Sequence, residues 1–514
     1  MHIFLYGPPG TGKSTVGKKL AGNLNLPFID LDRVIETNAG MSIPHIMEQQ
    51  GESAFRDLES VALKEAVGHA FSVTYPGGLQ TRPTEAIIAL GGGALLRDEN
   101  RAFAESNGKV FFLMAKLPTL LERLQNDAGE RPLLAGNLSM KLSALLVNRG
   151  EHYKSFPLCI QVDGKTAEQN AHQIQVVLGR HHLSAMGEYD VIVGQIANLP
   201  YPNPIIVTDE NVAKFHLEKI QALLNAKAVI IPAGEEHKNL ETISFLWKSF
   251  LEAGLDRKST VIALGGGVIS DMAGFAASTY MRGINWIAVP TTLLSMVDAS
   301  LGGKTGFDLP EGKNLIGSFY PPKLVLADPQ FLTTLPEAEL ISGMAEVVKH
   351  GIISDPELFN LCGRGLNWVK DNLEEIVKRA MAVKIKVIED DPYEKGFRAA
   401  LNLGHTVGHA VELVSGFKLR HGEAIAIGMV AEAKYSARVG LAGVGLVEAV
   451  TESLKELGLP IHIPEEMPRE EIIRAMRMDK KKNAKVIRFA LPVEIGRVEL
   501  AEVRVDDLGM VIGD

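Results

Sequence analysis

The chain has 514 residues, of which 46% are hydrophobic and 22% are charged. This composition is typical of a globular protein with about three or four domains or subdomains, and it excludes a disordered or collagen-like chain. The net charge of −9 and the 6% share of aromatic residues argue against a nucleic-acid groove, which needs a concentrated basic face.

The cysteines and the apolar runs indicate the cellular compartment of the protein. Cys159 and Cys362 lie far apart and lack the spacing of a zinc site, so a reducing compartment is expected. The apolar run at the N-terminus is too short for a signal peptide, and no later run reaches the ~18 residues of a membrane span. We therefore predict a cytoplasmic protein with no nucleic-acid or membrane partner.

The first 170 residues alternate between apolar runs and amphipathic stretches. Strand-like runs occur at 3–6, 28–29, 86–90 and 110–114, and helical patterns occur at 16–24 and 53–66. Strands that alternate with helices predict a mostly parallel α/β sheet. A turn-rich segment at 76–83 interrupts this order, and we expect it to be a surface loop.

A phosphate-binding loop follows the first predicted strand and has the pattern Gly7-x4-Gly12-Lys13-Ser14. Its glycines let backbone N–H groups wrap phosphates, its lysine neutralises the β and γ phosphates, and its serine hydroxyl can hold Mg²⁺. The pattern predicts an ATP site formed by Gly7, Gly10, Thr11, Gly12, Lys13, Ser14 and Thr15.

Residues after the next strands point to the acceptor of the phosphoryl group. Asp30 and Asp32 suit Mg²⁺ binding and hydroxyl activation, although either could instead cap the next helix. Arg56 lies on a predicted helix, where a single arginine more often faces solvent. Gly91, Gly92 and Gly93 end a strand and would let a substrate approach the backbone closely.

With these motifs, residues 1 to about 170 resemble the shikimate kinase family. The segment Arg131-Pro132-Leu133-Leu134 resembles the lid of that family, and Arg149 stands four residues before Tyr153, as in the family. The resemblance implies that shikimate is bound by Asp32, Arg56, Gly91, Gly92, Gly93 and Arg149. It also implies a magnesium site at Ser14 and Asp30 and catalysis by Lys13, Asp32 and Arg131, with Arg131 over the ATP phosphates. Arg123 is the nearest candidate for a second lid arginine.

A second alternation of strands and helices starts near residue 189. Strands are expected at 190–194, 204–207, 229–231, 260–264 and 286–289, mostly helices after 336, and a hairpin at 486–503. We predict a kinase-like α/β domain at 1–170, a linker at 171–188 and a second domain at 189–514. The second domain would consist of an α/β nucleotide-binding subdomain at 189–336 and a mostly helical metal-binding subdomain at 337–514.

The helical part contains residues that suit a metal ion. Glu346 lies among apolar neighbours, His405 and His409 lie four residues apart on one helix face, and His421 adds a third histidine. Two histidines and a carboxylate with an open position form a catalytic zinc pattern. The spacing leaves open whether His409 or His421 is the third ligand.

Glycine-rich segments with lysines precede the helical part. Gly265, Gly266 and Gly267 follow a buried strand but fail the dinucleotide fingerprint, because position 270 is serine. Lys304 and Lys313 lie in glycine-rich segments that we interpret as loops. There they suit a phosphorylated or carboxylated ligand, although either lysine alone could be an ordinary solvated side chain.

Residues from about 185 to 514 resemble 3-dehydroquinate synthase over nearly their whole length. The resemblance implies that Glu346, His405 and His421 bind Zn²⁺ or Co²⁺, whereas His409 stays off the metal and moves protons. It maps NAD⁺ contacts onto Asp209, Glu235, Lys238, Gly266, Gly267, Asp271, Thr291, Thr292, Asp298, Lys304, Lys313 and Thr334. The pocket for the heptulosonate phosphate would comprise Arg282, Lys304, Asn314, Lys349, Lys384, Glu394, Arg398, Asn402 and His409, with Lys304, Lys349, Arg398 and His409 as catalytic residues.

The two resemblances together imply a bifunctional enzyme of the shikimate pathway. One half would phosphorylate shikimate to 3-phosphoshikimate, and the other would convert 3-deoxy-arabino-heptulosonate 7-phosphate to 3-dehydroquinate and phosphate, with a possible homodimer through the second half. The alternatives are another small-metabolite kinase fused to a polyol dehydrogenase or to another sugar-phosphate cyclase. A dehydrogenase has no need for the phosphate pocket formed by Lys304, Lys313, Asn314 and Arg398.

Overall fold

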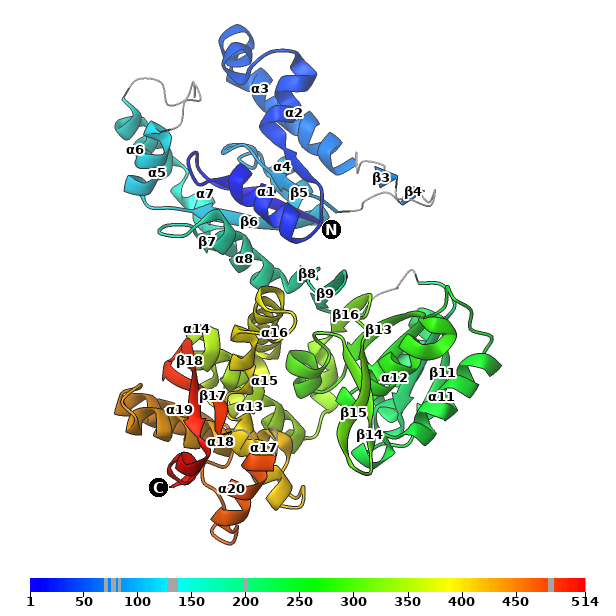
Figure 1. The fold of residues 1–514 in the computed structure, drawn as a ribbon. Coiled ribbons are helices and arrows are strands. Elements are labelled where there is room, and N and C mark those ends of the chain that lie inside the picture. Colours follow the sequence, from blue (N-terminus) through cyan, green and yellow to red (C-terminus); the bar gives the residue numbers. More distant parts are fainter. Residues whose placement is uncertain are drawn as a thin grey trace. The chain divides into compact units, whose positions relative to one another are not determined.

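The computed structural model describes residues 1–68, 73–74, 80–81, 85–126, 137–196, 201–478 and 485–513. The chain divides into two compact units, Met1–Val177 and Leu178–Asp514 (Figure 1). Each unit is described by itself. No helix among the described residues is long and apolar enough to cross a membrane.

The first unit is built on a parallel sheet of five strands in the order β2-β5-β1-β6-β7. The predicted α/β sheet is thus confirmed, and its middle strand β1 is buried along its whole length. The strands are β1 (His2–Tyr6), β2 (Phe28–Asp30), β5 (Ile87–Ala89), β6 (Gly108–Met114) and β7 (Leu158–Gln161).

Helices lie on both faces of this sheet: α1 (Lys13–Asn23), α2 (Leu31–Ala39), α3 (Ile43–Gly68), α4 (Asp98–Asn107), α5 (Leu117–Gln125), α6 (Leu138–Asn148), α7 (Gly150–Lys154) and α8 (Ala167–Leu178). Helix α3 changes direction at Gly51, whose φ is 83° and ψ is 170°. Of the loop predicted at 76–83, the structure describes β4 (Gln80–Thr81), which pairs with β3 (Val73–Thr74). The other residues of that loop lie outside the described ranges.

Helix α8 and strand β8 (Arg180–Leu183) occupy most of the predicted linker at 171–188, and the boundary between the two units falls inside it. Asn23 in α1 donates hydrogen bonds from Nδ2 to Glu168 Oε1 at 2.9 Å and to Gln175 Oε1 at 3.0 Å, which bind α8 to the first unit. Strand β8 pairs with β9 (Tyr189–Val193) in the second unit. The polar residues that indicated a linker include groups that bond to a neighbouring helix.

The second unit begins with a sheet of seven strands in the order β11-β10-β12-β13-β16-β9-β8, in which only the β8–β9 pair is antiparallel. Its other strands are β10 (Pro204–Asp209), β11 (Lys227–Ile231), β12 (Thr260–Gly265), β13 (Asn285–Pro290) and β16 (Leu324–Ala327). The helices of this part are α9 (Glu210–Val212), η2 (Ala213–Leu217), α10 (Glu218–Leu224), η3 (Glu235–His237), α11 (Leu240–Glu252), α12 (Gly267–Thr279), η4 (Tyr280–Arg282), η5 (Ser295–Ala299) and η6 (Pro329–Thr334). Parallel pairing places the carboxyl ends of β10, β12 and β13 at one edge, so the segments that follow these strands meet there.

Lys304 and Lys313 do not lie in loops, as the glycine content predicted. They lie on the two strands of an antiparallel hairpin, β14 (Lys304–Leu309) and β15 (Gly312–Phe319). A Cβ on Gly317 would lie 2.3 Å from the backbone oxygen of Thr305, so glycine lets the two strands approach each other here.

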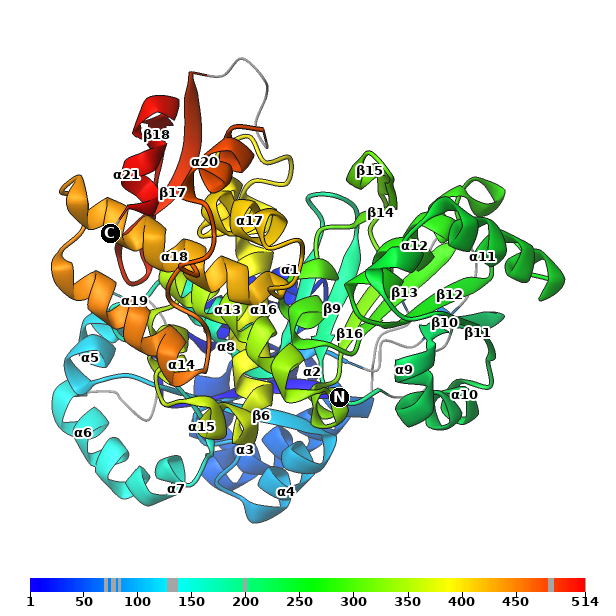
Figure 2. The same ribbon diagram turned by 90° about the horizontal axis from the view of Figure 1, so that it is seen from below.

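The remaining chain is mostly helical, as predicted, and α13 starts directly after Pro336. Its helices are α13 (Glu337–Ser354), α14 (Pro356–Cys362), α15 (Leu366–Asp371), α16 (Leu373–Asp390), η7 (Phe397–Asn402), α17 (His405–Val414), α18 (His421–Arg438), α19 (Val444–Glu456), α20 (Arg469–Met478), η8 (Val505–Asp507) and α21 (Leu508–Ile512). The predicted hairpin consists of β17 (Val486–Glu494) and β18 (Arg497–Arg504), and it packs with α18 and α21 (Figure 2).

Helices α13, α17 and α18 approach one another closely because glycines lie at the points of contact between them. A Cβ on Gly428 in α18 would lie 2.0 Å from the backbone oxygen of Gly404, and one on Gly422 would lie 1.8 Å from the oxygen of Ser342 in α13. Side chains at the starts of α17 and α18 and in the middle of α13 are therefore brought together.

Candidate active sites

The phosphate-binding loop of the first unit connects β1 to α1. Gly7, Gly10 and Gly12 have φ angles of 151°, 85° and 84°, which residues with a Cβ rarely adopt. The Lys13 ammonium donates to the backbone oxygens of Gly7 at 2.8 Å and Pro8 at 3.2 Å. The Lys13 side chain therefore folds back over the loop and is held by backbone oxygens of the loop.

Ser14 and Asp30 form a pair of oxygen ligands beside this loop. The Ser14 hydroxyl donates to Asp30 Oδ2 at 2.7 Å, which joins the first turn of α1 to the end of β2. A hydroxyl and a carboxylate are the oxygen donors that Mg²⁺ accepts next to nucleotide phosphates. The residues present therefore fit a magnesium ion.

Side chains from α2 and α3 pack against the glycines that follow β5. A Cβ on Gly91 would lie 2.7 Å from Glu59 Oε1 and 2.9 Å from Asp32 Oδ1, and one on Gly93 would lie 2.5 Å from Arg56 Nη1. The absence of side chains here lets two carboxylates and a guanidinium converge on one backbone segment. The arrangement suits a polyhydroxylated acid, whose hydroxyls and carboxylate need acceptors and donors at short range.

Glu59 was not among the predicted site residues. It forms an ion pair with Arg56, which also bonds to Glu52 at 2.9 Å, and it is 1% exposed. Burial raises the pKa of Glu59 to about 7, against the opposing effect of Arg56. Its sequence position on an amphipathic helix resembles that of a solvated acid, so no local signal distinguishes it.

Arg149 is held at the amino end of α7 by the backbone of Gly92. Its Nη1 donates to Gly92 O at 2.8 Å, and the Tyr153 hydroxyl donates to the same oxygen at 3.1 Å. The Tyr6 hydroxyl lies 3.4 Å from Gly92 O and 3.2 Å from His152 Nε2. Burial raises the pKa of Tyr6, so its hydroxyl stays protonated at neutral pH and remains a donor.

Arg123 on α5 contacts the other side of the phosphate-binding loop. Its Nη1 lies 3.4 Å from the backbone oxygens of Gly10 and Thr11. It lines a cavity of about 570 Å³ together with Asn126, Lys165 and Thr166. Arg131, predicted to act from the lid, lies outside the described residues.

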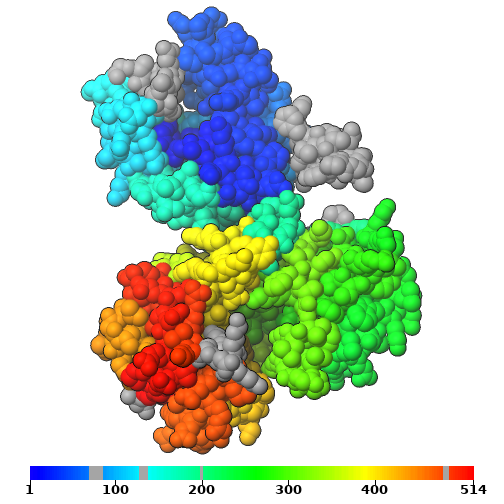
Figure 3. All heavy atoms as spheres, viewed as in Figure 1, coloured from blue at the N-terminus to red at the C-terminus, as the bar shows by residue number. Residues whose placement is uncertain are grey.

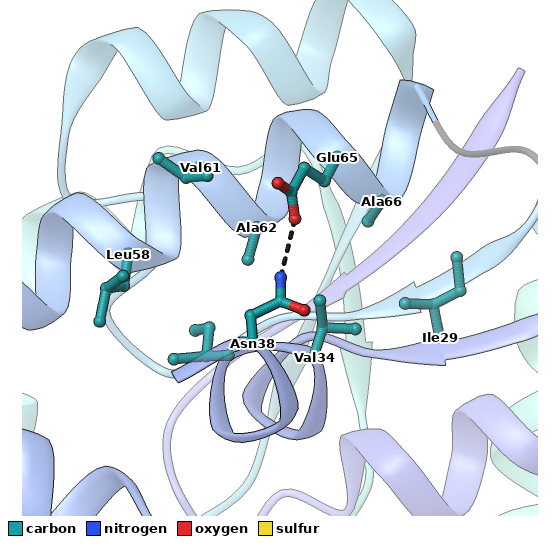
Figure 4. Close-up of a pocket in the computed structure, with 9 residues that line it drawn as sticks. Ile29, Val34, Asn38, Leu58, Val61, Ala62, Glu65 and Ala66 are labelled. Atoms are coloured by element: carbon teal, nitrogen blue, oxygen red, sulfur yellow. Dashed lines mark hydrogen bonds between the residues drawn. The ribbon is translucent and has the colours of Figure 1, made fainter. Parts of the chain in front are cut away.

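A separate cavity of about 500 Å³ lies between α2 and α3. Figure 4 shows its apolar lining from β2, α2 and α3, and Asn38 Nδ2 donates to Glu65 Oε2 at 2.8 Å across it. Its lining contains no cation. Asp32, Arg56 and Glu59, which converge on the glycines after β5, come from the same two helices but are not part of the lining.

In the second unit, Glu346, His405 and His421 bring their ligand atoms within 4.8 Å of one another. Glu346 Oε1 lies 3.6 Å from His405 Nε2 and 3.7 Å from His421 Nε2. The described residues give the two Glu346 oxygens no hydrogen bond, although Lys349 forms an ion pair with this fully buried carboxylate. Two nitrogens and an unsatisfied buried carboxylate fit a divalent metal such as Zn²⁺ or Co²⁺.

The two histidines differ in protonation when no metal is bound. Burial and the charge of Lys349 lower the pKa of His405 to about 3, so this imidazole is neutral. Burial alone would lower the pKa of His421, but the nearby carboxylates of Glu346 and Glu412 raise it to about 9. A cation that binds here must therefore displace a proton from His421.

The structure groups His421, not His409, with the other two ligand residues. The His409 ring lies 5.1 Å from that of His405 and 5.8 Å from that of His421, measured between centroids. A second group of possible ligands, Asp298, Glu346 and His350, lies on the far side of Glu346. The Lys384 ammonium pairs with Asp298 of that second group, which disfavours another cation there.

A cleft of about 670 Å³ contains two of the predicted metal ligands, His405 and His421, together with the predicted substrate residues. Figure 3 shows a hollow between the green α/β part and the yellow-to-red helical part of this unit. The lining includes both histidine ligands and His409 together with Asp271, Asp298, Lys304, Asn314, Lys349, Lys384, Glu394, Arg398 and Asn402. Four of these side chains are cationic, so an acidic protein presents a basic pocket to an anionic ligand.

Charged pairs organise this pocket. Lys384 bonds to Asp298 Oδ1 at 2.5 Å, and Lys304 lies 3.5 Å from Glu394 Oε2. Burial would raise the pKa of Asp298, but Lys384 and Lys349 outweigh it and hold the pKa below its usual value. Asp298 therefore stays ionised and orients Lys384.

The edge of the sheet where β10, β11 and β12 end contains the residues predicted to contact a dinucleotide. Gly266 and Gly267 begin α12, and a Cβ on either would lie 3.3 Å from Thr292 Cγ2 or Ala299 Cβ respectively. Lys238 binds Asp271 at 2.7 Å and Asn314 Oδ1 at 2.6 Å, and lies 3.8 Å from Glu235. The start of α12 has no side chains at Gly266 and Gly267, and the same edge of the sheet carries Lys238 with its acidic partners. A helix start of this kind fits the diphosphate of a dinucleotide.

Three predicted residues have other contacts in this structure. Asp209 accepts hydrogen bonds from the N–H groups of Asn211 and Val212, and Thr334 contacts His216 Nε2 at 2.8 Å. Arg282, which was predicted for the heptulosonate-phosphate pocket, ends η4 after α12 and is not among the residues that line the cleft.

Comparisons with known proteins identify the family of each half of the chain. The sequence pattern of the shikimate kinase family matches residues 9–178. The patterns of 3-dehydroquinate synthase, N-terminal and C-terminal, match residues 228–342 and 343–482. A 3-dehydroquinate synthase from Pelobacter propionicus is 41% identical over 365 residues, which cover 69% of this chain and 94% of that protein.

Solved structures of similar fold bind the ligands that the second site fits. A 2-deoxy-scyllo-inosose synthase complexed with carbaglucose-6-phosphate, NAD⁺ and Co²⁺ superposes with a TM-score of 0.59 at 28% identity, over 65% of this chain and 99% of that one. A 2-epi-5-epi-valiolone synthase from Streptomyces hygroscopicus with NAD⁺ and Zn²⁺ bound has a TM-score of 0.57 at 29% identity, over 63% of this chain and 95% of that one.

Proposed function

We propose residue roles for the two activities of this chain, which belongs to the 3-dehydroquinate synthase family and carries a shikimate kinase domain ahead of the synthase. The chain is a bifunctional enzyme of the shikimate pathway. Identity to 3-dehydroquinate synthases, 41% for the Pelobacter enzyme, exceeds the 28% and 29% found for the two other cyclases. The polyol dehydrogenase and other-cyclase alternatives are therefore set aside.

In the kinase half, the convergence of Asp32 and Arg56 on Gly91 and Gly93 supports shikimate as the acceptor. Asp32 orients the ring hydroxyls and accepts the proton of the attacking one, while Arg56 and Arg149 bind the carboxylate. Lys13 leaves its backbone acceptors to bind the phosphates of ATP. Mg²⁺ held by Ser14 and Asp30 would neutralise charge that develops on the transferred phosphoryl group.

In the synthase half, the location of His405, His421 and four cations in one cleft, with Glu346 grouped with the two histidines, supports the heptulosonate phosphate as substrate. Lys304, Lys349 and Arg398 bind its carboxylate and phosphate, and His409 moves protons beside the metal ligands. A metal held by Glu346, His405 and His421 would lower the pKa of a substrate hydroxyl, and NAD⁺ would take and return a hydride.

The synthase assignment is tested by supplying the heptulosonate phosphate with catalytic NAD⁺. We expect continued release of phosphate without accumulation of NADH, because the cofactor is restored in each cycle. Build-up of NADH in proportion to substrate would contradict this assignment. A chelator selective for transition metals, with Mg²⁺ in excess, should stop phosphate release and leave kinase activity intact.

The independence of the two sites is tested with Lys13→Ala. We expect kinase activity to fall by at least about a hundredfold, because a charge aimed at the transferring phosphates is lost. Synthase activity should stay within about twofold of the unaltered protein. Equal loss of both activities would rule out two separate sites.

We also propose that the protein is a cytoplasmic homodimer that pairs through its synthase half. The resemblance to 3-dehydroquinate synthase supports the dimer, and the dependence on ATP and NAD⁺ supports the compartment.

A further inference from the structure

Helix α17 carries one acidic residue beside its two histidines. Glu412 follows His405 by seven positions and His409 by three, so all three lie on one side of the helix. Its two oxygens have different partners: Oε2 lies 3.2 Å from His421 Nδ1, and Oε1 lies 3.6 Å from the Lys313 ammonium. One carboxylate thus connects a metal-ligand residue to a strand of the β14–β15 hairpin.

The contact with His421 decides which ring nitrogen can bind a metal. A carboxylate beside Nδ1 holds the proton on that nitrogen, which leaves Nε2 as the ligand atom. Nε2 is the nitrogen that faces Glu346, at 3.7 Å from Oε1. Glu412 is 14% exposed, so water competes little for its oxygens.

The contact with Lys313 joins the two parts of the second unit. Lys313 belongs to the hairpin at the edge of the α/β part, whereas Glu412 belongs to the helical part. The same ammonium lies 4.3 Å from the centre of the Phe417 ring, which follows α17. Lys313 is therefore held against the helical part by both a carboxylate and an aromatic face.

A carboxylate shared between two donors binds each less strongly than it would bind one. When Lys313 pairs with Glu412, the carboxylate carries less negative charge for the Nδ1–H of His421, and Nε2 becomes a weaker ligand. If Lys313 turns to an anionic ligand in the cleft, Glu412 becomes fully available to His421. The hairpin and the metal ligand are thus linked through one side chain.

We propose that Glu412 is a positioning residue that couples the β14–β15 hairpin to the metal ligand His421, so that metal affinity rises when Lys313 releases Glu412. The inference rests on the proposed metal site at Glu346, His405 and His421. Linkage is reciprocal, so a bound metal also favours release of Lys313 toward an anion in the cleft.

The test measures Zn²⁺ affinity of the full-length apo-protein by competition with a chromophoric chelator. Glu412→Gln should weaken Zn²⁺ binding by about 10- to 100-fold, because a lost outer partner of a metal-bound histidine has this effect. Lys313→Met should strengthen it by about two- to fivefold, the small change expected of a half-exposed ion pair. Glu448→Gln and Lys455→Met, at exposed positions of α19, are the matched controls and should change nothing.

The double variant Lys313→Met/Glu412→Gln separates coupling from a simple charge effect. If Lys313 acts through Glu412, the gain from Lys313→Met disappears in the Glu412→Gln background. Persistence of the full gain there would overturn the coupling. Opposite shifts from two neighbouring variants also distinguish this role from a loss of folding, which would weaken binding in both.

His421→Ala separates failure of this inference from failure of the metal site. If His421→Ala binds Zn²⁺ as tightly as the unaltered protein, the proposed metal site is wrong. If His421→Ala loses Zn²⁺ but Glu412→Gln stays within twofold of the unaltered protein, the metal site stands and the role of Glu412 is overturned. Should Glu412→Gln fail to fold, Lys313→Met decides alone, and unchanged affinity in that variant counts against the coupling.

Discussion

Glu59 is a buried acid that the fold keeps beside a substrate site. Its carboxylate is paired with Arg56 and faces Gly91, where a side chain would collide with it. Burial raises its pKa to about 7, so its charge changes within the physiological pH range. The kinase half therefore contains a carboxylate whose protonation alters the stability of the folded state.

Because the folded pKa of Glu59 is above its ordinary value of 4.5, the group stabilises the fold below pH 4.5 and loses this contribution as pH rises through about 7. Glu59→Gln cannot ionise and does not undergo this loss. We expect its thermal inactivation temperature, measured by kinase activity, to rise relative to the unaltered protein between pH 5 and pH 8.

Glu99→Gln, at an exposed position of α4, is the control and should keep a constant difference over the same range. Synthase activity in the same samples should be unaffected by Glu59→Gln. A difference that does not vary with pH would show that Glu59 ionises at its ordinary pKa.

At the scale of residues, motifs with fixed spacing could be predicted from the sequence. The residues on other elements that contact the site residues could not. Lys13, Ser14 and Asp30 converge as the loop pattern indicates, whereas spacing alone left His409 and His421 as equal candidates. Glu59 and Glu412 act through contacts with residues on other elements. Such contacts depend on helix packing, which the local sequence does not encode.

Packing of α17 against α18 depends on a glycine-to-glycine approach. A Cβ on Gly428 would lie 2.0 Å from Gly404 O and 2.9 Å from Gly408 N, and both are backbone atoms that cannot rotate away. Since α17 and α18 each begin with a metal-ligand histidine, separation of these helices would also separate the ligands.

Gly428→Ala should therefore destabilise the second unit by about 1–3 kcal/mol, the usual effect of overpacking, and weaken Zn²⁺ binding. Gly445→Ala in α19 is the control, because nothing lies within 4 Å of its added Cβ, and it should be neutral or slightly stabilising. Calorimetry and chelator competition measure the two effects. Unchanged stability in Gly428→Ala would mean that the helices can move apart freely.

At the scale of elements, alternation of strands and helices predicted both parallel sheets. The β14–β15 hairpin was interpreted as loops because Gly302, Gly303, Gly306, Gly312 and Gly317 suggest turns. In the structure, glycine at 306 and 317 instead permits close pairing of the two strands. Glycine content alone does not distinguish a turn from a tight strand contact.

The whole molecule consists of two units that meet at Val177 and Leu178, within helix α8 and ahead of strand β8. The sequence predicts two enzymes in one chain, and the boundary between the two units falls inside the predicted linker at 171–188. The polar residues of this segment suggest exposure, so the sequence does not reveal that helix α8 and strand β8 occupy most of it. The composition of a segment shows that its residues are polar, but it does not show which groups those residues bond to.

We expect the chain divided after Leu178 to give a fragment 1–178 with kinase activity and a fragment 179–514 with synthase activity. A shorter fragment 189–514 lacks β8, which leaves the edge of β9 unpaired. That fragment should aggregate more readily and unfold at a lower temperature, because an exposed strand edge can pair with other chains. Light scattering measures aggregation, and thermal unfolding measures stability. Equal behaviour of fragments 179–514 and 189–514 would contradict a structural role of β8.

Gly179 is the single residue between α8 and β8, and it is buried with a φ of 66°. A side chain at this position would lie 2.8 Å from Lys378 Cε and 2.9 Å from Val193 Cβ. Proteases cut exposed loop tips, and this connection offers none. Because one chain carries both catalysts, synthesis of each molecule supplies the two activities in a copy ratio of one to one.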